Sequence, residues 1–541
     1  MKLKIIFISF YFISTLFLFG CEKTDVKSFT IKKSADSTQI SNVILLKDSD
    51  YTGRGNDNET IIRATVILKS DSSVACKSIS FNLNGTTNLN DISSIKIYST
   101  GTSGYLNTRD VNGATLLGTT SSMNGVIVCN TKGTLSAGIN YLWLTYQINE
   151  SATEGDTVNA SLLSLTTSSE TYKVAQTQSQ GGRIILLAHK LIYAPGDLGS
   201  ANYRIPAIIT APDGSIIIAN DKRNFNEGDL PNDIDVMITR TTDGGKTWQT
   251  PGIIAKATST STGYGDASLT LAPNGDIICV FAGGQGLAAS TPSNPIRTYL
   301  CRSSDNGKTW TSPLDITNQL YGSGCSDPIR QSWYASFCAS GRGLLTRSGR
   351  IMLVAAVRET SSSRLSNFVY FSDDNGLTWK VSGRAMLGGD EAKVAELNNG
   401  NILMSIRHDG GGPRYYTIST DNGLTWGSVS TWPQLIEPGC NGDLIRYTST
   451  MDGYNKNRLL HSIPNNKTSR QNVSIFVSYD EGQTWPIKKS ICPGSSAYSS
   501  ITILPDGTIG AYVEENNPIS LYYINFSLGW LTNGADIYSK P

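Results

Sequence analysis

Apolar and polar positions alternate in short runs along most of this chain. One recurring element is a turn containing glycine followed by an apolar run of strand length: PDGSIIIAN at 212–220, with related segments at 273–281, 347–355, 398–406 and 505–513. A degenerate copy, DGYNKNRLLHSI, spans 452–463. Asp-Gly or Asn-Gly between two apolar runs is the strongest short signal for a β-hairpin, so these segments predict six hairpins. No long segment has the period of an amphipathic helix, and the chain is predicted to be mainly β.

A second repeat accompanies the hairpins. An octet of the form Ser/Thr-x-Asp-x-Gly-x-Thr-Trp occurs five times, at 241–248, 303–310, 372–379, 419–426 and 478–485. Hairpin and octet alternate, and the last hairpin has no octet after it. Two hairpins per unit give four antiparallel strands, so residues 188–541 are predicted to form a six-bladed β-propeller, whose radial closure removes exposed sheet edges.

Each octet is expected to form the turn between the third and fourth strands of a blade. Its aspartate can accept hydrogen bonds from the N–H groups of the turn, and its glycine permits positive φ. Its tryptophan is expected to pack between blades. Metal binding by the five aspartates is the less favoured alternative.

The N-terminal part of the chain lacks the octet. Residues 22–187 contain alternating strands such as SIKIY at 94–98 and predict a β-sandwich, either a spacer or a carbohydrate-binding module. Residues 1–21 have lysines followed by an apolar run and predict a secretory signal. The stretch LFGC resembles a bacterial lipobox, which would make Cys21 the lipidated first residue of the mature chain. The alternative is an ordinary cleaved signal with an incidental cysteine.

Composition narrows the classes of partner. The net charge is +1 and 16% of the residues are charged, so nothing indicates a nucleic-acid partner or a polyanion. With three histidines and no CxxC pair, neither a zinc site nor another cofactor is expected, and a structural calcium ion is left open. Export permits disulfides; Cys76 and Cys129 share one region, but their pairing is left open.

Counting from the turn glycines places polar residues at one mouth of the propeller. Four of them begin the innermost strands of different units: Arg204, Asp266, Glu391 and Tyr498, each nine or ten residues before a turn glycine. The return strands are antiparallel and lead back to the same mouth. They bring three further residues: Arg223, Arg407 and Arg470. A merely solvated polar rim is the alternative, but such a cluster favours a functional site.

These residue types favour one kind of chemistry. Guanidinium groups bind carboxylates with charge-assisted, often bidentate bonds. A tyrosine beside a glutamate is a candidate nucleophile and base, and a separate aspartate is a candidate general acid. Sialidases are the glycosidases that use a tyrosine nucleophile.

The motifs together resemble the bacterial exo-sialidases (neuraminidases) of glycoside hydrolase family 33. The octets match the Asp boxes of that family, and YRIPAI at 203–208 is similar to its Arg-Ile-Pro motif. The resemblance covers about 188–541, and the preceding region resembles, less specifically, the sandwich domains that accompany such enzymes. It implies hydrolysis of terminal α-linked sialic acids from glycoproteins, glycolipids and oligosaccharides, with retention of configuration.

The resemblance also implies roles for particular residues. Tyr498 matches the nucleophile, Glu391 the residue that activates it, and Asp229 the acid/base. Three arginines match the triad that binds the substrate carboxylate: Arg204, Arg407 and Arg470. Two residues match positions near the 4-hydroxyl of the sugar: Arg223 and Asp266.

Some assignments have competitors in the sequence. Asp233 and Asp235 lie close to Asp229, and Glu396 lies close to Glu391. Arg446 and Arg458 compete with Arg470 because their unit is irregular.

Other functions share the same motifs. A non-catalytic sialoglycan-binding propeller, a trans-sialidase and an adhesin would all fit much of the pattern. The expected partner is a sialylated glycan, and a monomer is expected. The expected location is the bacterial cell envelope, with the chain held on the outer membrane only through its lipid anchor.

Overall fold

The computed structural model describes residues 29–30, 39–69, 73–175, 181–362 and 364–541, so Cys21 and the predicted signal lie outside the described residues. Strands dominate the described part of the chain, and its two α-helices are single turns, α1 (Thr317–Leu320) and α2 (Leu528–Leu531). The prediction of a mainly β chain is confirmed. Within the described ranges, no helix is long and apolar enough to cross a membrane.

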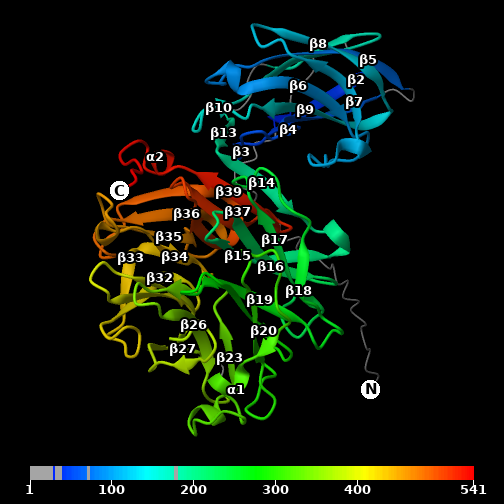
Figure 1. Cartoon of the computed structure of the whole chain (residues 1–541). Coiled ribbons are helices and arrows are strands. Elements are labelled where there is room, and N and C mark those ends of the chain that lie inside the picture. Colours follow the sequence, from blue (N-terminus) through cyan, green and yellow to red (C-terminus); the bar gives the residue numbers. More distant parts are fainter. Residues whose placement is uncertain (1–28, 31–38, 70–72, 176–180, 363) are drawn as a thin grey trace, which may run out of the picture.

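The N-terminal region, blue to cyan in Figure 1, contains three sheets. The largest has the order β1 (Phe29–Thr30), β2 (Ile40–Lys47), β4 (Glu59–Leu68), β9 (Gly138–Ile148), β6 (Ile92–Ser99), β7 (Thr115–Thr120). The second has the order β12 (Thr171–Lys173), β11 (Ser161–Thr167), β5 (Val74–Asn82), β8 (Ile127–Leu135). The smallest contains β10 (Thr157–Val158), β13 (Arg183–Leu186) and β3 (Tyr51–Gly53), with β13 and β3 parallel.

The two larger N-terminal sheets share one hydrophobic cluster. Val66 and Ile95 from the first sheet and Phe81 and Leu165 from the second are all buried in it. The burial pattern of β4 alternates along most of the strand, as expected when one face of a sheet covers a core. Cys76 and Cys129 lie buried on the neighbouring strands β5 and β8 as free thiols.

The C-terminal region, green to red in Figure 1, contains five sheets among its described residues. Two are four-stranded meanders: β15 (Asn202–Thr210), β16 (Ile216–Arg223), β17 (Ile234–Thr241), β18 (Gly252–Ala255); and β30 (Gly389–Glu396), β31 (Ile402–His408), β32 (Gly412–Ser419), β33 (Ser430–Glu437). A third has the order β22 (Leu314–Asp315), β21 (Arg297–Ser303), β20 (Ile277–Gly283), β19 (Tyr264–Leu271), β24 (Gly341–Arg342).

The remaining two sheets are more irregular. One is built on β23 (Ala335–Cys338), β26 (Ile351–Arg358), β27 (Ser366–Ser372) and β28 (Lys380–Val381), with β25 (Leu344–Leu345) paired to β26 and β29 (Met386–Leu387) to β27. The other has seven strands in the order β14 (Ala188–Tyr193), β39 (Ser520–Phe526), β38 (Ile509–Glu515), β37 (Ile487–Ile503), β36 (Gln471–Ser478), β35 (Arg458–Pro464), β34 (Asp443–Thr448).

The octets form the turns that the sequence predicts. Asp305 accepts hydrogen bonds from the backbone N–H groups of Lys308 and Thr309 at 3.0 and 2.9 Å, and from the Thr309 hydroxyl at 2.6 Å. Those bonds from Thr309 lower the pKa of Asp305 to about 2. Gly307 has φ of 81°. Trp310 packs against a cluster shared by the β15–β18 sheet and the β19–β22 sheet. The predicted structural role of the octets is therefore confirmed.

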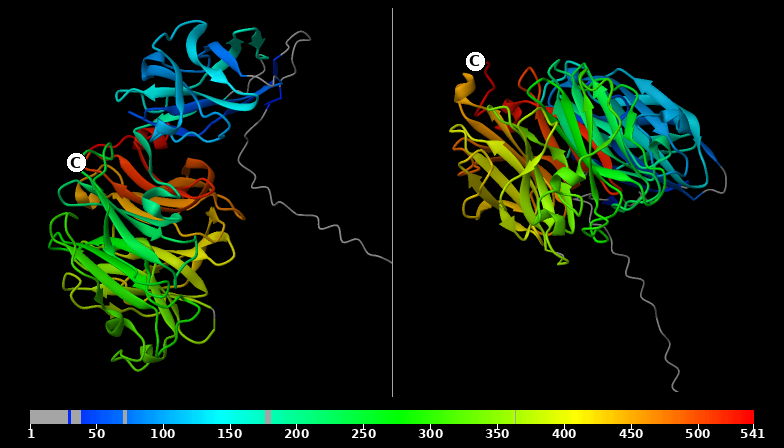
Figure 2. Two further views of the ribbon diagram at one scale, coloured as in Figure 1. Left: turned by 90° about the vertical axis from the view of Figure 1, so that its right-hand side faces the viewer. Right: turned by 60° about the horizontal axis from the view of Figure 1, so that its bottom comes forward.

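The N-terminal region lies against the last C-terminal sheet, next to β39 and α2 (Figures 1 and 2). The Tyr51 hydroxyl donates to the carbonyl oxygen of Ser490 at 2.8 Å, and its ring meets Trp530 edge-on at 5.7 Å between centroids. Tyr51 and Leu186 belong to the same buried cluster as Trp530. Apolar packing across this contact holds the two regions together.

Candidate active site

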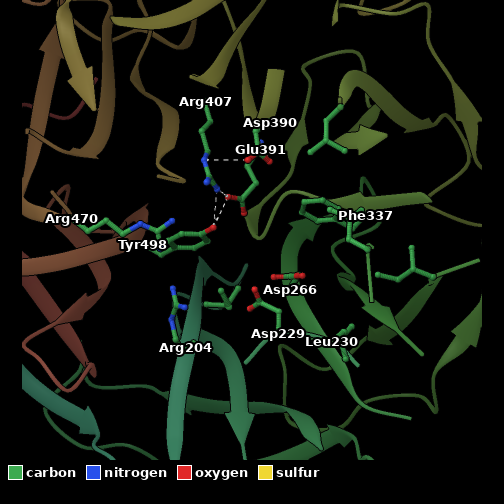
Figure 3. Close-up of a pocket in the computed structure, with 14 residues that line it drawn as sticks. Arg204, Asp229, Leu230, Asp266, Phe337, Asp390, Glu391, Arg407, Arg470 and Tyr498 are labelled. Atoms are coloured by element: carbon green, nitrogen blue, oxygen red, sulfur yellow. Dashed lines mark hydrogen bonds and ion pairs between the residues drawn. The ribbon is translucent and has the colours of Figure 1, made fainter. Parts of the chain in front are cut away.

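Seven of the eight residues predicted for the site line one cavity of about 270 Å³. They are Arg204, Asp229, Asp266, Glu391, Arg407, Arg470 and Tyr498. Figure 3 shows the three arginines around Tyr498, with the acidic residues between them and the apolar side chains of Leu230 and Phe337. The eighth residue, Arg223, is 1% exposed and lies behind Asp229 rather than on the cavity wall.

A local irregularity turns these side chains toward the cavity. The pairing register shifts near the start of β15, β19 and β30, at Arg204–Ala207, Gly265–Ser268 and Gly389–Ala392. It also shifts in the second half of β37, at Ser496–Ser499. A bulge bends its strand and redirects a side chain. Ile205 and Asp266 also have positive φ, 63° and 60°. The same local device thus positions a site residue on four different sheets.

Tyr498, Glu391 and Arg407 form a compact triplet. The Tyr498 hydroxyl donates to Oε2 of Glu391 at 2.6 Å. Arg407 Nη1 donates to the same carboxylate oxygen at 2.6 Å and to the Tyr498 oxygen at 3.1 Å. Burial and the charge of Glu391 raise the pKa of Tyr498 well above its usual value, although Arg407 acts in the opposite direction. The phenol is therefore neutral at neutral pH, with a proton acceptor in contact.

Arg204 is held by a fully buried carboxylate. Its Nε and Nη2 donate to the two oxygens of Glu514 at 2.9 and 3.1 Å. Glu514 also accepts from the backbone N–H groups of Ile205 and Tyr498 at 2.9 and 3.1 Å. Burial alone would raise the pKa of Glu514, but Arg204 and these hydrogen bonds lower it. One carboxylate thus fixes the positions of the arginine and the tyrosine.

Arg470 completes the arginine set from a third direction. Its Nη2 donates to the carbonyl oxygen of Gly439 at 3.2 Å. Arg204 and Arg470 both lie over the ring of Tyr498, at 5.5 and 5.4 Å from its centroid. The two guanidinium groups thus make cation–π contacts with the Tyr498 ring, and such contacts are attractive.

A chain of charges links Asp229 to Asp266 beneath the cavity. Arg223 Nη2 lies 2.7 Å from Oδ1 of Asp229 and 2.9 Å from Oδ2 of Asp221. Asp221 also accepts from the backbone N–H of Asp266 at 3.0 Å. Burial and the charge of Asp221 raise the pKa of Asp266 well above its usual value. The raised pKa favours the protonated form of Asp266, which can donate a hydrogen bond, whereas Asp229 lies exposed at the cavity edge.

One wall of the cavity is apolar. It is formed by Leu230, Leu287, Ile296, Phe337 and Leu365. A ligand that fits this cavity therefore has an anionic group for the arginines and an uncharged, partly apolar group for this wall.

The competing residues have partners elsewhere. Asp235 accepts from the backbone N–H of Ala257 at 2.8 Å, and Asp233 accepts from Asn224 at 2.8 Å. Glu396 accepts from the backbone N–H of Arg347 at 2.7 Å. Two arginines pair with other acids: Arg446 with Glu481 and Arg458 with Asp536. None of these five lines the cavity among the described residues.

Three acidic residues of the site were missed from sequence: Glu514, Asp390 and Asp221. Glu514 could have been predicted from the sequence, because it stands seven residues after Gly507, the same spacing that places Arg407 after Gly400. Asp390 lines the cavity beside Glu391, and its Oδ2 lies 3.3 Å from Nε of Arg407. Burial raises the pKa of Asp390 to about 6, although Arg407 lowers it. The same spacing of seven residues places Asp221 after Gly214, and Asp221 contacts Arg223 on its own strand and the backbone of Asp266 on the next sheet.

Within the described residues, no group of three or more His, Cys, Asp and Glu side chains is arranged to hold a metal ion.

Comparison with known proteins points to one family. Residues 225–511 match the family model described as a BNR repeat-like domain, and residues 54–171 match the N-terminal domain of BNR-repeat neuraminidase. A sialidase of Micromonospora viridifaciens is 34% identical over 357 residues, 62% of this chain and 53% of the relative. The chain thus spans about half the length of that relative.

Two further proteins are similar over most of both chains. A sialidase of Bacteroides fragilis is 28% identical over 496 residues, 83% of this chain and 88% of the relative. Among solved structures, the Hadza microbial sialidase Hz136 superposes with a TM-score of 0.72 at 25% identity, over 90% of this chain and 99% of that one. Because the repeat model alone spans more than half of the residues, the chain belongs to the BNR-repeat neuraminidase (sialidase) family that its octets and Arg-Ile-Pro segment predicted.

Proposed function

We propose that this protein is an exo-α-sialidase that hydrolyses terminal α-linked sialic acids from glycoproteins, glycolipids and oligosaccharides, with retention of configuration. The observation that carries the proposal is the 2.6 Å hydrogen bond from Tyr498 to Glu391 inside a cavity lined by three arginines. Glycosidases with a tyrosine nucleophile are sialidases. The sialidase relatives support the same activity.

The arginines account for recognition of the sugar. Sialic acid carries a carboxylate on its anomeric carbon, and the cavity is lined by Arg204 of β15, Arg407 of β31 and Arg470, the residue before β36. Each charge-assisted hydrogen bond contributes about 1.5–3 kcal/mol. Arg204 and Arg407 are already held by Glu514 and Glu391, so little side-chain freedom is lost on binding. The apolar wall can contact the acylated amine of the sugar.

The triplet accounts for bond cleavage. In the first step the Tyr498 hydroxyl passes its proton to Glu391, and its oxygen bonds to the anomeric carbon. The glycosidic bond breaks, and its oxygen takes a proton from Asp229. In the second step Asp229 takes a proton from water, which attacks the anomeric carbon. Tyr498 leaves as the phenolate and recovers its proton from Glu391.

A tyrosine suits this substrate for an electrostatic reason. The anomeric carbon stands beside the substrate's own carboxylate, which would repel a carboxylate nucleophile. A neutral phenol avoids that repulsion until Glu391 removes its proton.

We further propose that residues 188–541 form a six-bladed propeller. The first part of β37 pairs with β36 and its second part with β38, so the seven-stranded sheet divides into two four-stranded units. β14, at the start of this region, pairs with β39 and would close the ring as the outer strand of the last blade. Residues 22–187 would form the β-sandwich, since its two larger sheets share a core.

The proposed location rests on the sequence alone. Residues 1–21 would be a lipoprotein signal, and a lipid on Cys21 would anchor the enzyme to the outer membrane of the bacterial envelope. Metabolic labelling with a fatty-acid analogue should mark the wild-type chain and not a Cys21→Ser variant.

Release of free sialic acid from an α-linked sialoside tests the activity. The wild type should release it, and Tyr498→Phe should lose at least about a hundredfold in kcat while keeping the melting temperature, because it lacks only the nucleophilic oxygen. Binding without release by the wild type would indicate a lectin. Transfer of the sugar to an added glycan, in place of release, would indicate a trans-sialidase.

A further inference from the structure

Two ion pairs join the N-terminal region to the C-terminal region, one near each end of β14. Near the start of the strand, Glu150 lies 3.1 Å from Lys246 of the first octet, and both side chains are well exposed. Beyond the end of the strand, Arg109 Nη2 donates to both carboxylate oxygens of Asp197 at 2.9 and 2.7 Å. Arg109 Nη1 also donates to a backbone carbonyl oxygen of β14 at 3.1 Å. Nothing in the chemistry proposed above uses these contacts.

The contact made by Arg109 leads to the residue that precedes Arg204. The carbonyl oxygen of Asp197 accepts a hydrogen bond from the Tyr203 hydroxyl at 2.6 Å. The Tyr203 ring is fully buried and stacks on Tyr193, with 4.9 Å between centroids. Tyr203 and Arg204 are neighbours on β15. The ion pair between Arg109 and Asp197 therefore holds the loop against which the start of β15 is bonded.

A second contact leads to the residue that follows Glu514. His189 Nε2 lies 3.1 Å from Oε2 of Glu515, and both side chains are buried. The N-terminal region fixes the backbone of His189: its carbonyl oxygen accepts from Asn56 Nδ2 at 3.0 Å, and a Cβ at Gly53 would lie only 2.4 Å from its backbone nitrogen. Glu514 and Glu515 are consecutive on β38, so their side chains point to opposite faces of the sheet. One carboxylate holds Arg204 and the next is bonded at the junction of the two regions.

The charges at this junction favour a firm contact between His189 and Glu515. Burial alone would lower the pKa of His189, but Glu515, together with Asp50 and Glu59 of the N-terminal region, raises it above its usual value. Arg183 lies 2.7 Å from Asp50 and 3.1 Å from Glu59 and balances these two carboxylates. A buried ion pair is sensitive to the loss of either partner, because the other charge is left unpaired. The position of Glu515 on β38 is therefore fixed from the side of the N-terminal region.

We propose that Arg109 and Glu515 are positioning residues through which the N-terminal region holds Arg204 in the orientation that binds the substrate carboxylate. One contact acts on the backbone just before Arg204, and the other acts on the strand whose Glu514 receives the Arg204 guanidinium. A binding group has to be held within about 0.5 Å of its productive position. The assignment rests on the proposed sialidase activity and makes the N-terminal region part of the catalytic unit, although it does not touch the substrate.

Two variants of the Arg109 contact separate positioning from long-range electrostatics. Arg109→Gln and Asp197→Asn break the same ion pair, and each should raise KM for methyl α-sialoside about two- to fivefold while kcat changes less. The two substitutions change the net charge in opposite directions. An effect of charge alone on an anionic substrate would therefore raise KM in the first variant and lower it in the second.

Glu515→Gln tests the second contact and should raise KM about three- to tenfold, more than the Arg109 variant, because this pair is buried. Lys246→Gln is the matched control: it removes a cation from the other ion pair between the two regions, and its KM should equal that of the wild type. Melting temperatures show that each variant is folded.

A double-mutant cycle tests whether the effect passes through Arg204. In an Arg204→Lys background the guanidinium fork is already absent, so adding Arg109→Gln should change KM less than about 1.5-fold. A role confined to overall stability would give the same change of KM in both backgrounds.

The outcomes separate positioning from the activity itself. Unchanged KM in the Arg109, Asp197 and Glu515 variants overturns the positioning role while leaving the sialidase proposal intact. Opposite changes in Arg109→Gln and Asp197→Asn, an equal rise in Lys246→Gln, or full additivity with Arg204→Lys overturn it as well. If the wild type binds free sialic acid without cleaving the sialoside, the activity proposal fails, and calorimetric affinities for sialic acid replace KM in the same comparison. If the wild type neither binds nor cleaves, both proposals fail.

Discussion

The two rims of the C-terminal region use the same residue types in opposite ways. At the rim that carries the octets, each aspartate is bonded within its own turn, as Asp305 is by Thr309, and its pKa is low. At the rim that carries the cavity, Asp266 and Asp390 lie among other charged side chains, and burial raises their pKa values. Local bonding favours the charged form of a carboxyl, whereas desolvation disfavours it.

Arginine shows the same contrast. Arg347, at the octet rim, pairs with Asp452 at 3.3 Å, and both side chains are partly exposed, 32% and 48%. Arg204, in the cavity, pairs at 2.9 Å with a carboxylate that is 0% exposed. An exposed pair contributes about 0–1 kcal/mol, but breaking a buried pair costs about 3–5 kcal/mol. The charges of the cavity rim are therefore expected to be much more sensitive to substitution.

The largest effect is expected for Glu514→Gln. This change leaves the Arg204 guanidinium buried without its carboxylate, and the free energy of unfolding should fall by about 3 kcal/mol. Substrate affinity should fall as well, because Arg204 and Tyr498 lose a shared anchor. Denaturant unfolding measures the loss. Asp452→Asn at the octet rim is the control and should cost about 0.5 kcal/mol or less. Equal losses in the two variants would contradict the contrast between the rims.

The next effect concerns substrate binding by Arg204. Arg204→Lys keeps the charge but replaces a planar fork with a point charge, so KM should rise about tenfold or more while kcat changes less. Steady-state kinetics on methyl α-sialoside measures both constants. Arg347→Lys is the matched control at the octet rim and should leave KM unchanged. A similar KM for wild type and Arg204→Lys would refute the carboxylate-binding role.

A smaller effect depends on pH. Asp390 has a folded pKa of about 6, above the 3.8 of an unperturbed Asp, so it binds its proton more tightly in the folded state. Its stabilising contribution is complete below about pH 4 and is lost as the pH rises through about 6. Asparagine cannot ionise, so the Asp390→Asn variant has no charge at this position at any pH. It should be about 1 kcal/mol more stable than wild type near pH 8, with little difference in stability near pH 4. Thermal melts at the two pH values test this, and an advantage confined to low pH would contradict it.

The octet aspartates should show the opposite pH dependence with the smallest effect. The folded pKa of Asp305 is about 2, below 3.8, so its stabilisation is present above about pH 4 and is lost as the pH falls through about 2. Asp305→Asn should cost about 1 kcal/mol at neutral pH through weakened hydrogen bonds to Lys308 and Thr309, and less near pH 2. A loss that grows at low pH would show that the turn is not stabilised by the charged carboxylate.

How far the site could be predicted depends on the distance over which each contact acts. Arg407 and Tyr498 follow from their spacing to Gly400 and Gly507, because a hairpin of constant length returns its strands to the same mouth. The same count places Asp221 after Gly214, but it does not predict the contact of Asp221 with the backbone of Asp266, which lies on the next sheet. Arg223 was predicted beside the substrate, yet it is buried behind Asp229.

The sequence by itself determined what is local and repeated: the octet turns, the hairpins, the mainly β class, and the strands on which Arg204, Glu391, Arg407 and Tyr498 stand. These features depend on hydrogen bonds and backbone angles within a few residues. The same local pattern therefore occurs in each copy of the sequence repeat. Tertiary structure alone decided the rest. The raised pKa of Asp266, the anchoring of Arg204 by Glu514 and the convergence of the site residues on one cavity arise where different sheets meet. Desolvation and charge pairing depend on distances in space, and spacing along the chain does not record them.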